Sequence, residues 1–305
     1  MYDILVYGPL FCDLVFTGLP EMPSLGVELF ASDLTIAIGG SAIVAVGLRR
    51  LEARVGLIAE LGNDPLSAVA RQLLDAEGLE RALLREHPHP LPQITVALSF
   101  PQDRAFVTRF QRPETPPDLA ALLREHPAKH LHICSFLAAF DLPDAARAAH
   151  EAGLTVSLDP GWDKTALRDR RLRDMIAEVD IFMPSESELR FIAQEDDVAE
   201  AARRLMPARA GALVIVKQGA DGATLYRKDT PPLHVPAIPV TPVDTTGAGD
   251  SFDAGFLDAF VRGDSLALCM QIGSICGGLA TTAPGGTTAL PSRTEVETWL
   301  SKLRS

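Results

Sequence analysis

The stretch from Asp244 to Phe256, DTTGAGDSFDAGF, holds the residues best suited to chemistry. An apolar segment (233–243) precedes it and apolar residues at helical spacing follow it, so its glycines stand where a loop becomes a helix. The first N–H groups of a helix have no partner inside the helix and attract anions, and glycine has no β-carbon to keep an anion away. The sequence therefore predicts an anion site at Gly247, Ala248 and Gly249.

Asp250 lies in the first turn of this predicted helix, beside the predicted anion. A carboxylate next to a bound polyphosphate is electrostatically unfavourable, which points to a chemical role. The role that suits a carboxylate there is to accept the proton of a hydroxyl group. The alternative is an acid that only caps the helix or complements its dipole.

The thirteen-residue string closely resembles the signature of the ribokinase-like carbohydrate kinases, the PfkB family. A lone GxGD would be a weak signal, but a match of this length is specific. The resemblance implies that Asp250 is the catalytic base, that ATP is the phosphate donor and that Mg²⁺ bridges its phosphates. It also implies the family's fold, a three-layer α/β/α sandwich with a mostly parallel central sheet and a small β-sheet lid.

The rest of the chain has a pattern compatible with that fold. From His130 onward, strand-like and helix-like segments alternate, which indicates βαβ units and a parallel sheet covered on both faces. The segments 12–38 and 93–111 instead alternate apolar and polar residues between turn signals. We expect these two segments to form the lid, within one kinase domain that spans residues 1–305.

In the family that the sequence resembles, an Asp of the lid segment and a Gly-Gly pair contact the hydroxyl groups of the acceptor sugar. The resemblance implies substrate contacts at Asp13, Gly39, Gly40 and Ser41. The plain alternatives are a turn-forming Asp13 and an ordinary strand-to-helix turn at the glycines. The sequence departs from the family pattern GGxxxN here. Its segment GGSAIVAV places Val44, or Ile43 if one residue has been lost, where the family has an Asn.

Two later segments, PSESE and ALVIVKQGADGATLY, resemble the nucleotide side of the family's site. Glu188 matches a Glu that helps to hold magnesium and phosphate through water, whereas Ser185 replaces an Asn. A helix cap and a hairpin loop are the alternative interpretations. The resemblance predicts nucleotide contacts at Ser185, Lys217, Gln218, Gly219, Gly222 and Ser274. The small residues of the segment 265–282, Ser274 among them, suit close packing against another helix as well as against an adenine ring.

Asp244 and the carbonyl of Thr246 match positions that hold a monovalent cation in several relatives, which predicts activation by K⁺. Asp253 follows Asp250 by one helical turn but stands at a variable position of the motif. We therefore expect Asp253 to be a solvated helix acid. The repeated heptad ALLREHP is expected to be a strand at Ala82–Pro88 and a helix end at Ala121–Pro127.

Composition excludes several classes of protein. A net charge of −12 and a pI near 5.0, with no cluster of basic and aromatic residues, argue against nucleic acid as a partner. No apolar run reaches membrane-spanning length, and four cysteines without CxxC spacing suit a reducing cytoplasm. The half-buried pattern and open edges of the lid strands predict a homodimer formed through the lid.

The sequence thus predicts an ATP-dependent kinase that phosphorylates a hydroxymethyl group of a small sugar or sugar acid. A nucleoside kinase of the same fold is the closest alternative, and aromatic residues such as Phe11 are candidates to clamp a base. A nucleotide-binding protein without catalysis is the alternative from another class. A dinucleotide-binding oxidoreductase is disfavoured because Phe252 stands at the third glycine position of GxGxxG.

Overall fold

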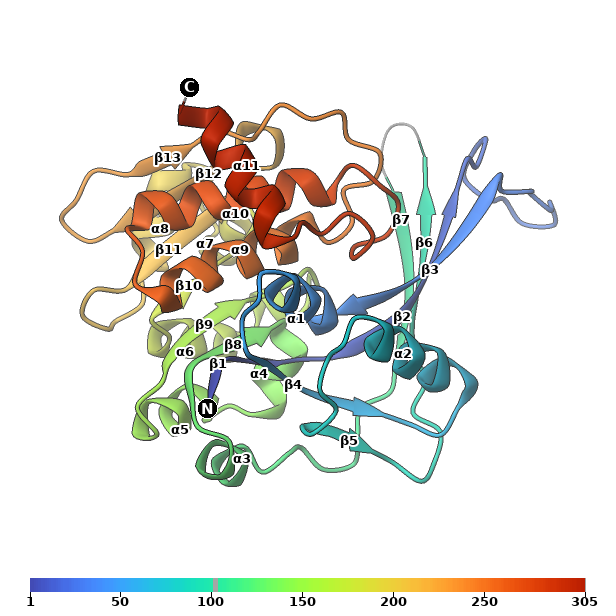
Figure 1. Ribbon diagram of the computed structural model, residues 1–305, viewed down its shortest axis with the longest axis horizontal. Coiled ribbons are helices and arrows are strands. Elements are labelled where there is room, and N and C mark those ends of the chain that lie inside the picture. Colours follow the sequence, from blue (N-terminus) through green and yellow to red (C-terminus); the bar gives the residue numbers. More distant parts are fainter. Residues whose placement is uncertain (101–103, 305) are drawn as a thin grey trace.

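The computed structural model describes residues 1–100 and 104–304, so the predicted lid turn at Pro101–Asp103 lies outside the described residues. In the described part, the larger of two sheets has nine strands, and those from β11 to β5 run parallel (Figure 1). Its order is β13 (Leu233–Val235), β12 (Ala223–Arg227), β11 (Leu213–Lys217), β10 (Ile181–Phe182), β9 (Thr155–Asp159), β8 (Ala128–Cys134), β1 (Tyr2–Tyr7), β4 (Val55–Leu61) and β5 (Leu84–Glu86).

Helices cover both faces of this sheet, because side chains alternate along buried strands. Ile4 and Val6 of β1 pack into one apolar layer, whereas Leu5 and Tyr7 pack into the other. The first layer is completed by α1 (Ser41–Arg50), α2 (Pro65–Ala76), α9 (Ala248–Arg262), α10 (Leu266–Ala280) and α11 (Arg293–Arg304). The second is completed by α3 (Leu119–Glu125), α4 (Phe136–Asp141), α5 (Ala145–Glu151), α6 (Arg170–Glu178), α7 (Glu186–Ala193) and α8 (Val198–Arg204). The predicted three-layer sandwich is confirmed.

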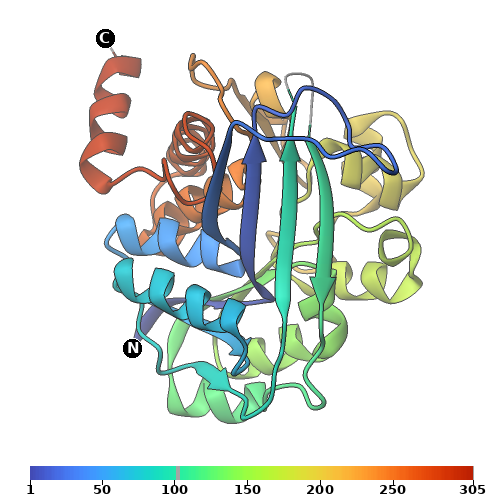
Figure 2. The ribbon, with the colours of Figure 1, turned by 90° about the vertical axis from the view of Figure 1, so that its right-hand side faces the viewer.

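The smaller sheet projects from one side of the sandwich (Figures 1 and 2). Its order is β3 (Asp33–Gly40), β2 (Leu10–Thr17), β6 (Gln93–Ser99) and β7 (Arg104–Phe110), with β2 and β6 parallel and the other pairs antiparallel. Large apolar side chains are exposed on it and on the loop between β2 and β3, namely Leu25, Val27, Phe30, Leu34, Ile36, Phe106 and Val107. This sheet is the predicted lid, and its strands run into the sandwich close to the site described below.

Two local outcomes show what the tertiary context decides. The apolar segment 233–243 has a strand-like pattern, but it forms only the three-residue strand β13, since Pro236, Pro239 and Pro242 cannot donate to a strand ladder. The repeated heptad forms strand β5 in its first copy and helix α3 in its second, as predicted. The first copy pairs with β4, whereas the Asp118 side chain caps the helix of the second. Across residues 1–100 and 104–304, the structure contains no helix long and apolar enough to cross a bilayer.

Candidate active site

The predicted anion loop lies at the start of α9. Gly247 has a φ of 71°, in the left-handed region that favours glycine, and a β-carbon there would lie 2.9 Å from the Cα of Gly286. Within the described part of the chain, the N–H groups of Gly247 and Gly249 have no hydrogen-bond partner. The loop therefore presents unpaired donors at a helix N-terminus, which is the geometry that binds phosphate.

Two neighbouring cavities meet at this loop. The first, of about 540 Å³, lies between the lid side of the molecule and the loop, and the second, of about 430 Å³, lies on the far side of the loop under the segment 237–242. The two cavities share the lining residues Lys217, Gly219, Thr245, Ala248 and Gly249. An elongated ligand that fills both cavities would therefore pass directly over the glycine loop.

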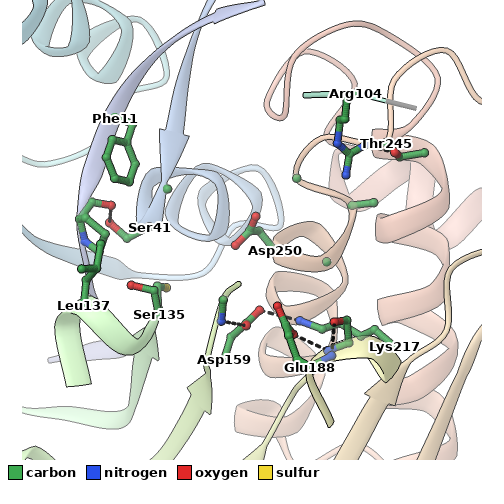
Figure 3. Close-up of a pocket in the computed structure, with 18 of the residues that line it drawn as sticks. Phe11, Ser41, Arg104, Ser135, Leu137, Asp159, Glu188, Lys217, Thr245 and Asp250 are labelled. Atoms are coloured by element: carbon green, nitrogen blue, oxygen red, sulfur yellow. Dashed lines mark hydrogen bonds and ion pairs between the residues drawn. The ribbon is translucent and has the colours of Figure 1, made fainter. Parts of the chain in front are cut away.

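Asp250 lines the first cavity, and its carboxylate points into the open space there (Figure 3). Burial raises the pKa of Asp250 to about 7, the negative charge of Asp159 adds to the rise, and Lys217 opposes it. A carboxyl group whose pKa lies near neutrality is suited to take up a proton at physiological pH.

The predicted acceptor residues lie together at the lid end of the first cavity. Gly40 and Ser41 line its wall, but the Ser41 hydroxyl donates to the carbonyls of Gly8 at 3.1 Å and Pro9 at 3.0 Å. Asp13 is buried against Gly39, one layer behind this wall. Burial raises the pKa of Asp13 to about 7, and the charge of Asp244 adds to the rise.

We expect Gly39→Ala to displace Asp13 and to impair the acceptor side of the site. A β-carbon at position 39 would lie 2.0 Å from Oδ2 of Asp13, so this carboxylate must move. We expect the acceptor kcat/KM to fall by about 10- to 100-fold with ATP affinity unchanged, because misplacement of about 1 Å has effects of this size. Steady-state kinetics and calorimetry measure the two quantities. Gly26→Asn, at a lid position with no atom within 4 Å, is the control, and equal losses in both variants would contradict the prediction.

Among the residues predicted to contact the nucleotide or its metal, Ser185 and Glu188 form a helix cap and are also part of the cavity wall. The Ser185 Oγ accepts from the Glu188 N–H at 3.3 Å, and Glu188 Oε2 accepts from the Ser185 N–H at 2.7 Å. Both residues line the first cavity, whereas Gly222 and Ser274 line the second. The Ser274 hydroxyl donates to the Pro236 carbonyl at 2.8 Å.

Gln218 does not line either cavity. Its Nε2 donates to Glu186 at 2.8 Å and its Oε1 accepts from Thr224 at 2.7 Å. These contacts turn the side chain toward α7 and β12 and away from both cavities, in contrast to its neighbours Lys217 and Gly219.

Asp244 joins two loops behind the anion site. Its Oδ1 accepts from the N–H of Thr246 at 2.9 Å and from the Thr246 hydroxyl at 2.7 Å, and its Oδ2 accepts from the Gly285 N–H at 2.9 Å. Neither Asp244 nor Thr246 lines a cavity, whereas Thr245 between them lines both. The pair therefore fixes the shape of the loop that leads into Gly247.

The prediction that Asp253 is a solvated acid is wrong. Asp253 is 0% exposed, and its two carboxylate oxygens lie 2.9 and 3.1 Å from the Nζ of Lys217. The reason is that α9 lies in the middle of its layer, packed by α1 and α10, so every residue from 251 to 259 is buried. No pattern within the helix could reveal this, since the partner Lys217 lies 36 residues earlier on β11.

The sequence also gave no sign of a contribution from Arg104. This residue begins β7 of the lid, lines the first cavity and donates a hydrogen bond to the hydroxyl of Thr245 (Figure 3). The lid therefore places a guanidinium group beside the anion loop.

Taken together, a parallel sandwich, a β lid and a glycine loop between two cavities define a phosphotransferase of the ribokinase fold. Residues 12–293 match the profile of the "pfkB family carbohydrate kinase", and the chain belongs to this family. It is a carbohydrate kinase, an enzyme that transfers phosphate to a hydroxyl group.

Known relatives and solved structures agree with this assignment. The chain is 32% identical to a fructokinase of Klebsiella pneumoniae over 85% of this chain and 90% of the relative. It is 27% identical to a nucleoside kinase of Methanothermobacter thermautotrophicus over 96% of this chain and 94% of the relative. The structure of Arabidopsis thaliana ribokinase complexed with ribose and ATP superimposes with a TM-score of 0.84 at 23% identity, covering 98% of each chain.

Proposed function

We propose that this protein is an ATP-dependent kinase that phosphorylates a hydroxymethyl group of a small sugar or sugar acid, with residues 1–305 acting as one kinase domain. The observation that carries the proposal is the position of Asp250. Its carboxylate points into the first cavity, between the wall at Gly40 and Ser41 and the unpaired N–H groups of the anion loop. A hydroxyl bound there would meet a proton acceptor and a phosphate site together.

The proposed reaction is a direct displacement. The acceptor hydroxyl gives its proton to Asp250 while its oxygen bonds to the γ-phosphorus, and the bond from that phosphorus to the bridging oxygen of ADP breaks. The unpaired N–H groups of Gly247 and Gly249 are proposed to stabilise the negative charge that develops on the phosphoryl oxygens, whereas the N–H of Ala248 between them donates to the Thr245 carbonyl at 3.3 Å. Asp13, behind Gly39, is proposed to bind hydroxyl groups of the acceptor.

The second cavity is proposed to hold the nucleoside part of ATP. Its lining is mostly apolar, and the small residues Ser274 and Gly277 leave room for a flat ring beside the Phe252 side chain. Mg²⁺, when bound, would neutralise the negative charge of the phosphates. Glu188 fits the task of holding this ion, because its buried carboxylate lines the first cavity at the loop. We further propose that Asp244 and the Thr246 carbonyl hold K⁺ behind the loop.

Nucleoside phosphorylation is the second candidate function, and the position of Phe11 favours it. The Phe11 ring lines the first cavity and packs against Phe110 with the ring centroids 5.8 Å apart. An aromatic face at the acceptor end would suit a stacked base.

A panel of acceptors tests the function and separates the candidates. Thermal shift and ATP consumption are measured over ribose, fructose, 2-keto-3-deoxygluconate and nucleosides. Phosphorylation of a sugar or sugar acid supports the proposal, and selective turnover of a nucleoside supports the alternative. ATP binding without turnover of any acceptor would indicate a nucleotide-binding protein without catalysis and would overturn the proposal.

We expect the protein to be a homodimer that associates through its lid. The exposed apolar side chains of Leu34, Ile36 and Val107 would otherwise face water beside open strand edges. Analytical ultracentrifugation at micromolar concentration should show a dimer that Ile36→Glu converts to a monomer. Leu303→Glu, at an exposed leucine of α11, is the control and should stay dimeric. A monomeric parent protein would refute the prediction.

A further inference from the structure

The Lys217 side chain is held between two carboxylates at the end of β11. Its Nζ lies 2.6 Å from Oδ2 of Asp159 and 2.9 and 3.1 Å from the two oxygens of Asp253. The side chain is only 11% exposed, and the Lys217 N–H donates to the Pro184 carbonyl at 2.9 Å. Both the backbone and the tip of this lysine are therefore fixed in place (Figure 3).

The surroundings keep this ammonium group charged. Burial alone would lower the pKa of Lys217, but the charges of Asp159 and Asp253 outweigh burial and raise the pKa well above its usual value. Burial also raises the pKa of Asp253, and the positive charge of Lys217 offsets only part of that rise. A buried cation and its carboxylates cost desolvation energy and add little net stability, so stability alone does not explain the cluster.

The position of the ammonium group points to a ligand. Lys217 lines both cavities, directly below the anion loop, and a β-carbon built on Gly249 would lie 3.4 Å from its Nζ. An ammonium group has three N–H donors. The hydrogen bonds to Oδ2 of Asp159 and to both oxygens of Asp253 account for all three. What the ammonium group can offer a ligand is therefore its fixed positive charge at the point where the two cavities join, not a spare donor.

We propose that Asp253 and Asp159 are positioning residues that hold the Lys217 ammonium at the junction of the two cavities, where it contacts the phosphoryl group in transit. This inference rests on the proposed kinase function and adds to it a cation fixed by the protein itself. Asp253 is the decisive member, because it comes from α9, the same helix that carries the anion loop and Asp250. Asp159 and Asp253, which we call the clamp, thus fix the ammonium group relative to Asp250 and the anion loop. Without the clamp, the lysine side chain would be free to sample several rotamers.

A double-mutant cycle tests the clamp. We expect Lys217→Met to lower kcat by about 10²- to 10³-fold, the effect of removing one fixed electrostatic contact to the developing charge. We expect Asp253→Asn to lower kcat by about tenfold and the double variant to be no worse than Lys217→Met, because residues that act through one group are not additive. Calorimetry with ATP and with adenosine gives a second readout. The ratio of ATP affinity to adenosine affinity should fall across the variants in the same order as kcat.

Asp258→Asn is the matched control. Asp258 lies on the same helix, is 2% exposed and pairs with Arg293 at 2.9 Å, but it lines neither cavity. We expect it to lower thermal stability and to leave kcat unchanged. The proposal is overturned if Asp253→Asn behaves like Asp258→Asn, or if the losses multiply in the double variant.

Two outcomes remain distinguishable from failure of the clamp. Lys217→Met leaves two buried carboxylates without a partner and can fail to fold. The comparison of Asp253→Asn with Asp258→Asn then decides the question alone. If the parent protein transfers no phosphate to any acceptor, the proposed function fails, and the ATP and adenosine affinities of the same variants still decide whether Asp253 acts through Lys217.

Discussion

Asp250→Asn is expected to lower turnover by roughly 10²- to 10⁴-fold, the usual contribution of a positioned general base. Asn keeps the shape of the side chain and the start of α9 but cannot take up the hydroxyl proton. ATP affinity should persist or increase, because one negative charge beside the phosphates disappears. Calorimetry with ATP and a coupled assay of sugar phosphorylation on the same protein measure both effects.

A control separates this result from a general effect of lost charge. Asp264→Asn removes the same charge just beyond the other end of α9, where Asp264 pairs with Arg262 at 2.8 Å and lines neither cavity. Its turnover should match that of the parent protein. Unchanged turnover in Asp250→Asn would mean that Asp250 is only structural, and the proposed mechanism would lose its main support.

Removal of Mg²⁺ is expected to reduce phosphate transfer to the background of the assay. The triphosphate carries roughly four negative charges. The first cavity is lined by two basic side chains, Lys217 and Arg104, and by three acidic ones, Asp159, Glu188 and Asp250. The protein alone therefore cannot neutralise the nucleotide. Activity is measured in excess chelator and again during titration with Mg²⁺, which should restore it.

The thermal unfolding temperature in the same chelator series is the control. Among the described residues, no group of three or more His, Cys, Asp or Glu side chains forms a metal site. The unfolding temperature should therefore not change when Mg²⁺ is removed. Full turnover in excess chelator would contradict the prediction.

The parts of the site that the sequence predicts best are contiguous in the chain. Each of these parts lies where a strand or loop runs into a helix, and a local sequence pattern predicts such a junction. They are the loop at 247–249, Asp250 and the capping pair Ser185 and Glu188. The same holds for the parallel sheet, because alternation of strands and helices repeats over more than half of the chain.

What the sequence could not predict depends on contacts between distant segments. Asp253 looks like a surface acid until β11 brings Lys217 beneath it, and Arg104 reaches Thr245 across 141 positions of the chain. Gln218 shows the converse, since its neighbours line the cavities while its own side chain turns toward Glu186. In all three cases the decisive partner is chosen by tertiary packing, which a helical or strand period does not contain.

The two halves of the first cavity come from different parts of the chain. The wall proposed to hold the acceptor is built by residues from Pro9 to Ser41, by Arg104 and by Cys134, Ser135 and Leu137, whereas the side proposed to hold the phosphates is built by residues from Asp159 to Asp250. If the proposed roles hold, natural selection can alter the early, lid-bearing segments and change which acceptor is used without disturbing the residues proposed to transfer phosphate. The departure from GGxxxN at Val44, beside an intact GAGD loop, is consistent with such divergence. We expect that exchanging residues 9–41 and 93–111 between family members would transfer the acceptor preference of one enzyme to the other.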